Sequence, residues 1–191
     1  MTSAHKNAII DTVEKATGVT KGTPMSIDDA VKGANPKYQT DRQYRVNCQR
    51  CVQAYELRRR GYDVEALPKP KSRSSINWGN ECFVDSKTVA KDEAWLSFDF
   101  KLSEADIIDR LNQAPDNSRH IIYACWKSGS SHVFIADKEN GIIRYVDPQS
   151  GKLDCSSHFS KARENKYGIF RVDDKDITDN ANIVKKTVQR S

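Results

Sequence analysis

The chain has 191 residues, of which 37% are hydrophobic and 30% charged, a length that suits one compact domain with a short extension rather than two full domains. The net charge of +5 is spread along the chain without an aromatic-interleaved basic motif, so nothing indicates nucleic acid as a partner. No run reaches the roughly 18 apolar residues of a membrane span, residues 1–7 lack the apolar core of a signal peptide, and five irregularly spaced cysteines argue against a disulfide scaffold.

The N-terminal part is predicted to be helical. Apolar residues at helical spacing over Ser3–Ala16 predict a first helix that Gly18 ends. Ser26 and Asp29 have the spacing of a capping box and predict a short helix that runs through Val31 and ends at Gly33. We therefore expect a helical extension over residues 1–33 and a domain over residues 34–191, which begins with an extended polar segment over 37–46.

The next helix has the clearest boundaries in the sequence. Asn47 is a preferred N-cap residue, and Gly61 is a preferred residue just beyond a helix C-terminus. Positive charge over 58–60 lies where the helix dipole is negative. The pattern predicts a helix over Cys48–Arg60 whose buried face begins with Cys48 and continues through Cys51, Val52 and Tyr55.

The second half of the chain changes to the two-residue period of strands. The first predicted elements are a strand over 62–67 and an exposed loop over 68–79. An ambiguous segment with a helix near 88–96 follows, and then a helix that Ser103 caps and Pro115 ends. Short β-rich runs then cover 119–126, 132–136, 142–147 and 167–172, and a closing helix is predicted over 176–188. The fold class is therefore α+β, with helices packed on an antiparallel sheet.

Cys48 is the candidate nucleophile. A helix N-terminus stabilises a thiolate through free backbone N–H groups and the positive end of the helix dipole. The same N–H groups can stabilise the oxyanion that forms when a thiolate attacks a carbonyl group. Without further residues, the spacing of Cys48 and Cys51 also fits half a zinc site or a redox pair, although no second pair of cysteines has that spacing.

His132 and Asp147 are the candidate partners of this thiol. His132 begins one predicted strand, and Asp147 ends the next. A two-residue turn at 140–141, or a four-residue turn over 138–141, places both side chains on one face of the hairpin, whereas a three-residue turn separates them. Of the other histidines, we expect His120 to be packed in a strand, and His5 and His158 to be exposed.

Several motifs together resemble the papain-fold toxin family of glutamine deamidases, domains similar to the C-terminal modules of bacterial polymorphic toxins and to phage head-morphogenesis proteins. The resemblance extends from about Ser26 to the C-terminus. It rests on residues 35–38 (NPKY), 47–56 (NCQRCVQAYE), 60–64 (RGYDV), 132–134 (HVF) and 147–149 (DPQ).

The resemblance implies a papain-like fold and a catalytic triad of Cys48, His132 and Asp147 that deamidates a glutamine side chain of a target protein, with no cofactor and no metal. The substrate and oxyanion residues that it implies are Asn47, Gln149 and Gln43. Within the same chemistry, a cysteine peptidase, isopeptidase or acyltransferase is the alternative, and a non-catalytic phage structural or binding domain is the alternative of another class.

The resemblance also implies the setting in which the chain works. We expect a soluble monomer, without a membrane partner, in the cytosol of its producer or of a target cell after delivery. A toxin of this kind would also need a cognate immunity protein.

Overall fold

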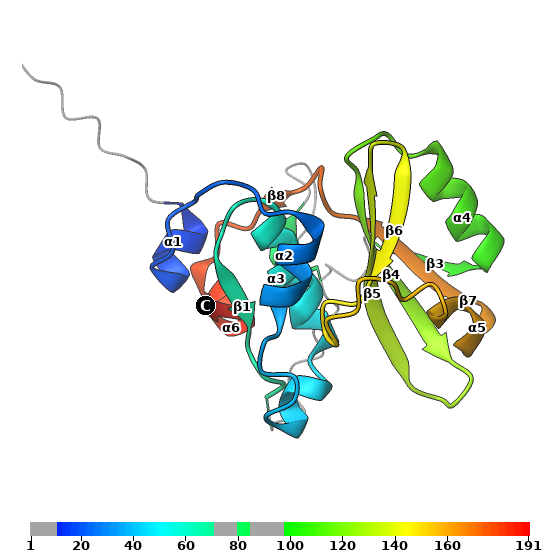
Figure 1. Cartoon of the computed structure of the whole chain (residues 1–191), viewed down its shortest axis with the longest axis horizontal. Helices are drawn as coiled ribbons and strands as arrows, with labels where there is room; N and C mark the ends of the chain where they lie inside the picture. The colour runs from blue at the N-terminus through cyan, green and yellow to red at the C-terminus, as the bar shows by residue number, and fades with distance from the viewer. Residues whose placement is uncertain (1–10, 71–79, 85–97) are drawn as a thin grey trace, which may run out of the picture.

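The computed structural model describes residues 11–70, 80–84 and 98–191 of the chain. Figure 1 shows a helical half and a sheet half, with α3 next to the sheet. The described helices are α1 (Thr12–Thr17), α2 (Ile27–Ala34), the 3-10 helix η1 (Arg42–Arg45), α3 (Cys48–Arg59), α4 (Glu104–Gln113), α5 (His158–Lys161) and α6 (Ala181–Thr187).

The sheet half is a five-stranded antiparallel sheet with the order β3-β7-β4-β5-β6. Its strands are β3 (Asp99–Leu102), β4 (Arg119–Trp126), β5 (Ser131–Glu139), β6 (Ile142–Val146) and β7 (Ala162–Arg171). Helices α4 and α5 lie on the side of this sheet away from α3 (Figure 1). Helices with antiparallel sheets confirm the predicted α+β class.

Two small antiparallel pairs connect distant parts of the chain. Strand β1 (Val64–Ala66) pairs with β9 (Val188–Arg190), and β2 (Phe83–Val84) pairs with β8 (Asp176–Ile177). The predicted closing helix over 176–188 is therefore wrong at both ends, because only Ala181–Thr187 is helical. The segment over 37–46, predicted to be extended, instead contains turns and η1.

Helix α3 begins where predicted and forms the centre of the helical half. Each of its residues from Cys51 to Arg58 is buried, because α2 covers one side and β5 lies on another. Val13 of α1 and Val31 of α2 belong to the same apolar cluster as the α3 side chains. The boundary between residues 33 and 34 stays a prediction.

The hairpin that joins β5 to β6 has the two-residue turn, one of the two turns that would place His132 and Asp147 on one face. Glu139 pairs with Ile142, and the turn residues Asn140 and Gly141 both have positive φ, at 54° and 76°. Positive φ at both positions is typical of a type I′ turn, whose twist matches that of the flanking strands. The register is thereby fixed along the whole hairpin, which pairs Ile135 with Val146.

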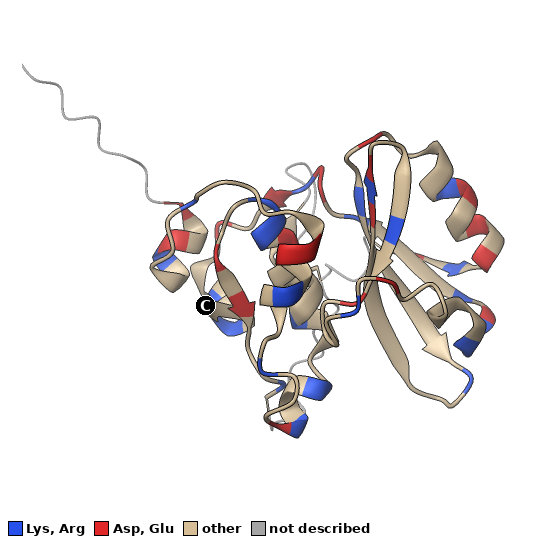
Figure 2. Cartoon of the chain, in the orientation of Figure 1, with Lys and Arg blue, Asp and Glu red and all other residues tan. Residues whose placement is uncertain are grey.

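The cap predicted for the helix before Pro115 is present. Ser103 and Asp106 form the full capping box of α4. The helix predicted near 88–96 and most of the one over 3–16 lie outside the described residues. Among the residues that the structure describes, no helix is both long and apolar enough to cross a membrane. Figure 2 shows basic and acidic residues interspersed over both halves.

Candidate active site

The candidate site lies where the N-terminus of α3 meets the β5–β6 hairpin. Cys48 is the first residue of α3 and is 7% exposed. Since Ile135 pairs with Val146, the register places Asp147 diagonally adjacent to His132 on the same face of the hairpin. The Nε2 atom of His132 lies 3.3 Å from Oδ1 of Asp147. The structure thus brings together the residues that sequence reasoning selected.

His132 is the side chain that links the other two. Burial acts against its protonation, but hydrogen bonds to Asp147 and to Cys48 outweigh burial and raise the pKa of His132 to about 10. Because Nε2 faces Asp147, the Nδ1 atom is the ring nitrogen left to face the thiol. An imidazole between a thiol and a carboxylate can accept a proton from sulfur while the carboxylate stabilises the resulting charge.

Asp147 is held in place by its own turn. Its backbone pairs with Lys152, and its carboxylate accepts hydrogen bonds from the backbone N–H of Gln149 at 3.0 Å and from the hydroxyl of Ser150 at 2.7 Å. Burial opposes ionisation of Asp147, yet the hydrogen bonds from His132 and His158 outweigh burial and hold its pKa well below the usual range. Asp147 is therefore a fixed anion.

The side chain of Asn47 does not cap α3, although Asn is a preferred residue at that position. It makes no capping hydrogen bond. Instead its amide nitrogen donates to the carbonyl of Leu67 at 3.0 Å, and its oxygen accepts from the Cys51 thiol at 3.2 Å. The first N–H groups of α3 are therefore not used by this cap, which leaves them to stabilise negative charge beside Cys48.

Asn35 connects the helix N-terminus to the turn that carries Asp147. Its amide nitrogen donates to the carbonyl of Gln149 at 2.7 Å and to that of Tyr44 at 2.9 Å, and its oxygen accepts from Asn47 at 3.3 Å. Sequence reasoning used Asn35 only as part of the family resemblance. The Asn-Pro pair gave no sign of this buried bridge.

Gln149 and Gln43 are the other residues predicted to bind substrate or oxyanion. Gln149 is buried, and its amide nitrogen has no hydrogen-bond partner among the described residues. Gln43 lies in η1, where its backbone carbonyl accepts from the N–H of Lys69. Their roles in binding substrate stay predictions.

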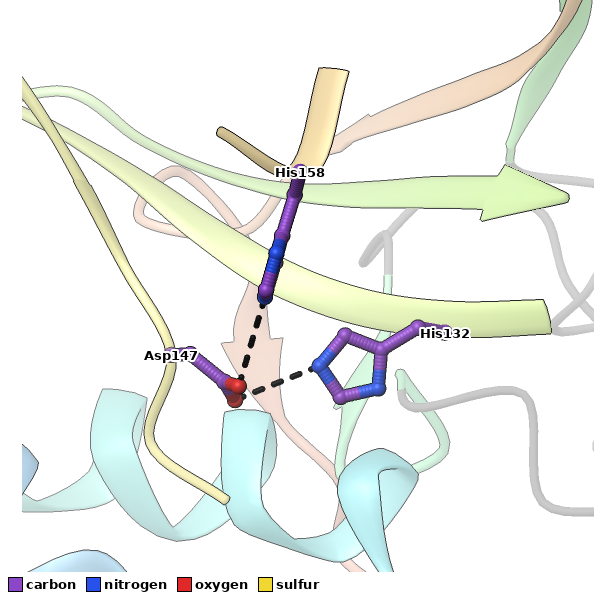
Figure 3. Close-up of side chains that lie close together, drawn as sticks. All are labelled: His132, Asp147 and His158. Atoms are coloured by element: carbon purple, nitrogen blue, oxygen red, sulfur yellow. Dashed lines mark hydrogen bonds and ion pairs between the residues drawn. The ribbon is translucent and has the colours of Figure 1, made fainter. Parts of the chain in front are cut away.

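His158 is the residue that the sequence analysis placed wrongly. It was predicted to be exposed, but it is buried at the start of α5, and its Nε2 atom lies 3.4 Å from Oδ2 of Asp147. Figure 3 shows the His132 and His158 side chains pointing at the same carboxylate from different elements. The polar neighbours of His158 in sequence are exposed serines, so no local signal indicated its burial.

Aromatic rings surround the two histidines. Trp126 stacks on His132 with ring centroids 5.7 Å apart and contacts His158 edge-on at 5.3 Å. Phe134 meets the His158 ring at 5.5 Å. In the described chain, His132, Asp147 and His158 are also the group whose donor atoms, all within 4.8 Å of one another, could hold a metal ion.

Cys51 and Cys82 are buried cysteines outside the candidate triad. Burial raises the pKa of Cys51 well above its usual value and that of Cys82 to about 12. All five cysteines are free thiols. Cys51 therefore acts as a buried apolar side chain beside the candidate nucleophile.

Comparison with known proteins supports the same class. The family described as "Papain fold toxin 1, glutamine deamidase" matches residues 46–152, more than half of the chain. The protein belongs to this family, and its α+β fold is papain-like. A search of curated proteins finds no match. The matched segment contains Cys48, His132 and Asp147 but ends before His158.

Proposed function

We propose that the protein is a toxin that deamidates a glutamine side chain of a target protein, with Cys48 as nucleophile, His132 as general base and acid, and Asp147 as the residue that orients His132. The observation that carries the proposal is the position of the buried His132 ring, whose Nε2 atom lies 3.3 Å from the Asp147 carboxylate and whose pKa is raised by both Asp147 and Cys48. Family membership supplies the substrate class.

The first half of the reaction transfers the acyl group to sulfur. His132 holds the proton of Cys48, and the thiolate forms a bond to the carboxamide carbon of the glutamine. Negative charge moves to the carbonyl oxygen, next to the uncapped first turn of α3. When the C–N bond breaks, His132 gives its proton to the leaving nitrogen, and ammonia departs.

The second half returns the enzyme to its starting state. Water attacks the thioester carbon while His132 accepts one proton from the water, and the C–S bond breaks to release glutamate and the Cys48 thiolate. We assign Asn47, Gln149 and Gln43 to the binding of substrate or oxyanion. The buried, unpartnered amide of Gln149, as described, supports a donor role for that side chain.

The biological setting is part of the proposal. Conversion of a neutral glutamine to a negative glutamate can disrupt an interface of the target, which suits a toxin or effector delivered by a bacterium or phage. A producer cell that contains the target would then need an immunity protein that covers the active site. Co-purification with a small protein encoded nearby would support this partner.

The experiment compares the wild-type protein with Cys48→Ala on a target-cell proteome by mass spectrometry. We expect glutamine-containing peptides that gain about one dalton, the difference between an amide and an acid, with the wild type alone. Cys51→Ala is the matched control, because it removes a thiol one turn away, and it should retain deamidation. New chain ends in place of this mass change would indicate a peptidase, and equal deamidation with Cys48→Ala would refute the proposal.

A further inference from the structure

The geometry of the histidine pair suggests a second use of the same carboxylate. We propose that His132, Asp147 and His158 form a zinc-binding site, the His–Asp–His cluster, and that zinc bound there inhibits the enzyme. The inhibition, but not the binding, rests on the proposed function.

The ligand types fit zinc. Two imidazole nitrogens and one carboxylate oxygen, with the fourth position left to water, are a ligand set that zinc takes in proteins. Both imidazoles offer the Nε2 atom, and both point at the Asp147 carboxylate (Figure 3). A direct Asp147 contact for each ring means that no backbone movement is needed to gather the three donors.

The distances also fit. Zinc binds nitrogen and oxygen at about 2.0 to 2.2 Å, so two ligand atoms of a tetrahedral ion lie about 3.3 to 3.6 Å apart. The Nε2 atom of His132 lies 3.3 Å from Oδ1 of Asp147, and that of His158 lies 3.4 Å from Oδ2, so each ring faces its own oxygen of the carboxylate. One donor atom from each of the three residues lies within 4.8 Å of the other two. Both distances exceed the about 2.7 to 2.9 Å of a charge-assisted hydrogen bond. The spacing is therefore also compatible with an ion that a ring nitrogen and a carboxylate oxygen share.

Neighbouring groups hold the donors in position. Ser150 and the backbone of Gln149 donate to the carboxylate, and such outer-shell contacts orient ligating carboxylates. The rings of Trp126 and Phe134 pack against His158 and restrict its rotation. His158 is not a member of the proposed triad, and it lies outside the matched family segment.

Zinc at this position would compete with catalysis. The ion would occupy the Nε2 atom of His132 and the carboxylate of Asp147, so an imidazolium stabilised by that carboxylate could not form opposite Cys48. Removal of zinc would restore the triad. Free zinc in the surrounding cytosol would thus set the fraction of active enzyme.

The test measures zinc binding to the purified full chain by competition with a chromogenic chelator. We expect one zinc ion per chain in the wild type. Loss of an outer-shell partner lowers metal affinity by about 10- to 100-fold, and His158→Gln, which removes a ligand, should lower the zinc affinity by more. This substitution keeps a hydrogen-bond donor for Asp147. His120→Gln, which changes another buried histidine outside the cluster, should bind zinc like the wild type.

Two further measurements use the unmodified protein. Co2+ in place of zinc should give the visible spectrum of a nitrogen and oxygen site, and zinc should shift the His132 and His158 ring resonances in nuclear magnetic resonance spectra. A thiolate-to-metal charge-transfer band would mean that a cysteine binds the ion, and equal affinity of wild type and a folded His158→Gln would remove His158 as a ligand. Either result overturns the proposed site.

Deamidation assays with added zinc distinguish failure of the zinc site from failure of the proposed function. Deamidation by the wild type should fall with added zinc and return with a chelator, each rate being compared with the same protein's zinc-free rate. Zinc binding through His158 without any deamidation would refute the function and the inhibition but leave the site intact. Deamidation that zinc does not inhibit, or that zinc accelerates, would overturn the inhibition alone.

Discussion

At the scale of single residues, His132 determines whether the site can work. Its ring is buried, which alone would favour the neutral form, and yet two hydrogen-bonded partners raise its pKa to about 10. His120 in β4 shows the effect of burial without such partners, because burial lowers its pKa to about 4. The hydrogen-bonded partners of His132 therefore explain why the pKa values of these two buried histidines shift in opposite directions.

We predict that nuclear magnetic resonance titration will separate these two histidines. His132 should remain protonated through neutral pH and titrate near 10, and its pKa should fall in both Cys48→Ala and Asp147→Asn, because each change removes a group that raises it. His120 is the internal control and should titrate near 4 in all three proteins. A His132 pKa near 6.5 that neither substitution changes would contradict the proposed thiol–imidazole–carboxylate contact.

At the scale of elements, two glycines fix the ends of the helix and the hairpin that form the site. Gly61 follows α3 with a φ of 101°, and a Cβ added there would lie 2.3 Å from the carbonyl oxygen of Gly22. Gly141 has a φ of 76° in the hairpin turn, with nothing within 4 Å of an added Cβ. Both positions require left-handed backbone, but only Gly61 is also crowded.

We predict a graded loss of stability from this difference. Gly141→Ala should cost about 1 to 2 kcal/mol, the cost of a left-handed conformation for a residue with a Cβ atom. Gly61→Ala should cost more, because the backbone at Gly22 must also move. Urea unfolding at neutral pH measures both values, and Gly22→Ala, with negative φ and only an ordinary contact for its Cβ, is the control. A smaller cost for Gly61→Ala than for Gly141→Ala would show that this reading of the α3 terminus is wrong.

Elements specified by neighbouring residues could be predicted from the sequence. Strand β4 has the predicted bounds, and α3 ends one residue earlier than predicted. The observed turn at 140–141 is one of the two turns that the sequence offered for placing His132 and Asp147 on one face. The prediction failed where partners are remote. Val188–Arg190 becomes a strand because Val64–Ala66 pairs with it, and no local pattern in the C-terminal segment reports that partner.

The same reasoning explains what was missed in the site. Cys48, His132 and Asp147 could be selected because a helix start and a hairpin register each restrict side-chain position. His158 could not, because its burial depends on Trp126, Phe134 and Asp147, which come from three other parts of the chain. The prediction that the Asn47 side chain caps α3 was wrong for a related reason. The Leu67 carbonyl and the Cys51 thiol bind that side chain, and the helix N–H groups do not.

At the scale of the whole molecule, buried charges join the helical half to the sheet half at the end of α3 away from Cys48. The fully buried Glu56 of α3 accepts hydrogen bonds from Arg60 at 2.7 Å and from Arg119 of β4 at 2.6 and 3.0 Å. Asp137 of β5 accepts from Tyr55 at 2.6 Å. The site thus depends on ion pairs that keep α3 against the sheet.

We predict that Glu56→Ala will destabilise the protein by about 3 to 5 kcal/mol, because it leaves two largely buried guanidinium groups without their carboxylate. Asp28→Ala is the matched control. It removes a carboxylate from an exposed pair with Arg144 and should cost less than about 1 kcal/mol. Urea unfolding measures both, and similar costs for the two variants would mean that the buried network does not hold the halves together.

Acid should weaken the whole fold through His120. The unfolded chain binds a proton at this residue below about pH 6.5, whereas the folded chain does so only below about pH 4, so protons favour the unfolded state between these values. The free energy of unfolding should therefore fall as the pH decreases from 6.5 to 4, by at most about 1.4 kcal/mol per pH unit from this residue. His120→Gln has no such titration, so its stability should fall less over that range, while Asp147 affects both proteins equally. If the free energies of unfolding of the wild type and His120→Gln fall in parallel as the pH decreases, His120 is not a buried neutral group with a lowered pKa.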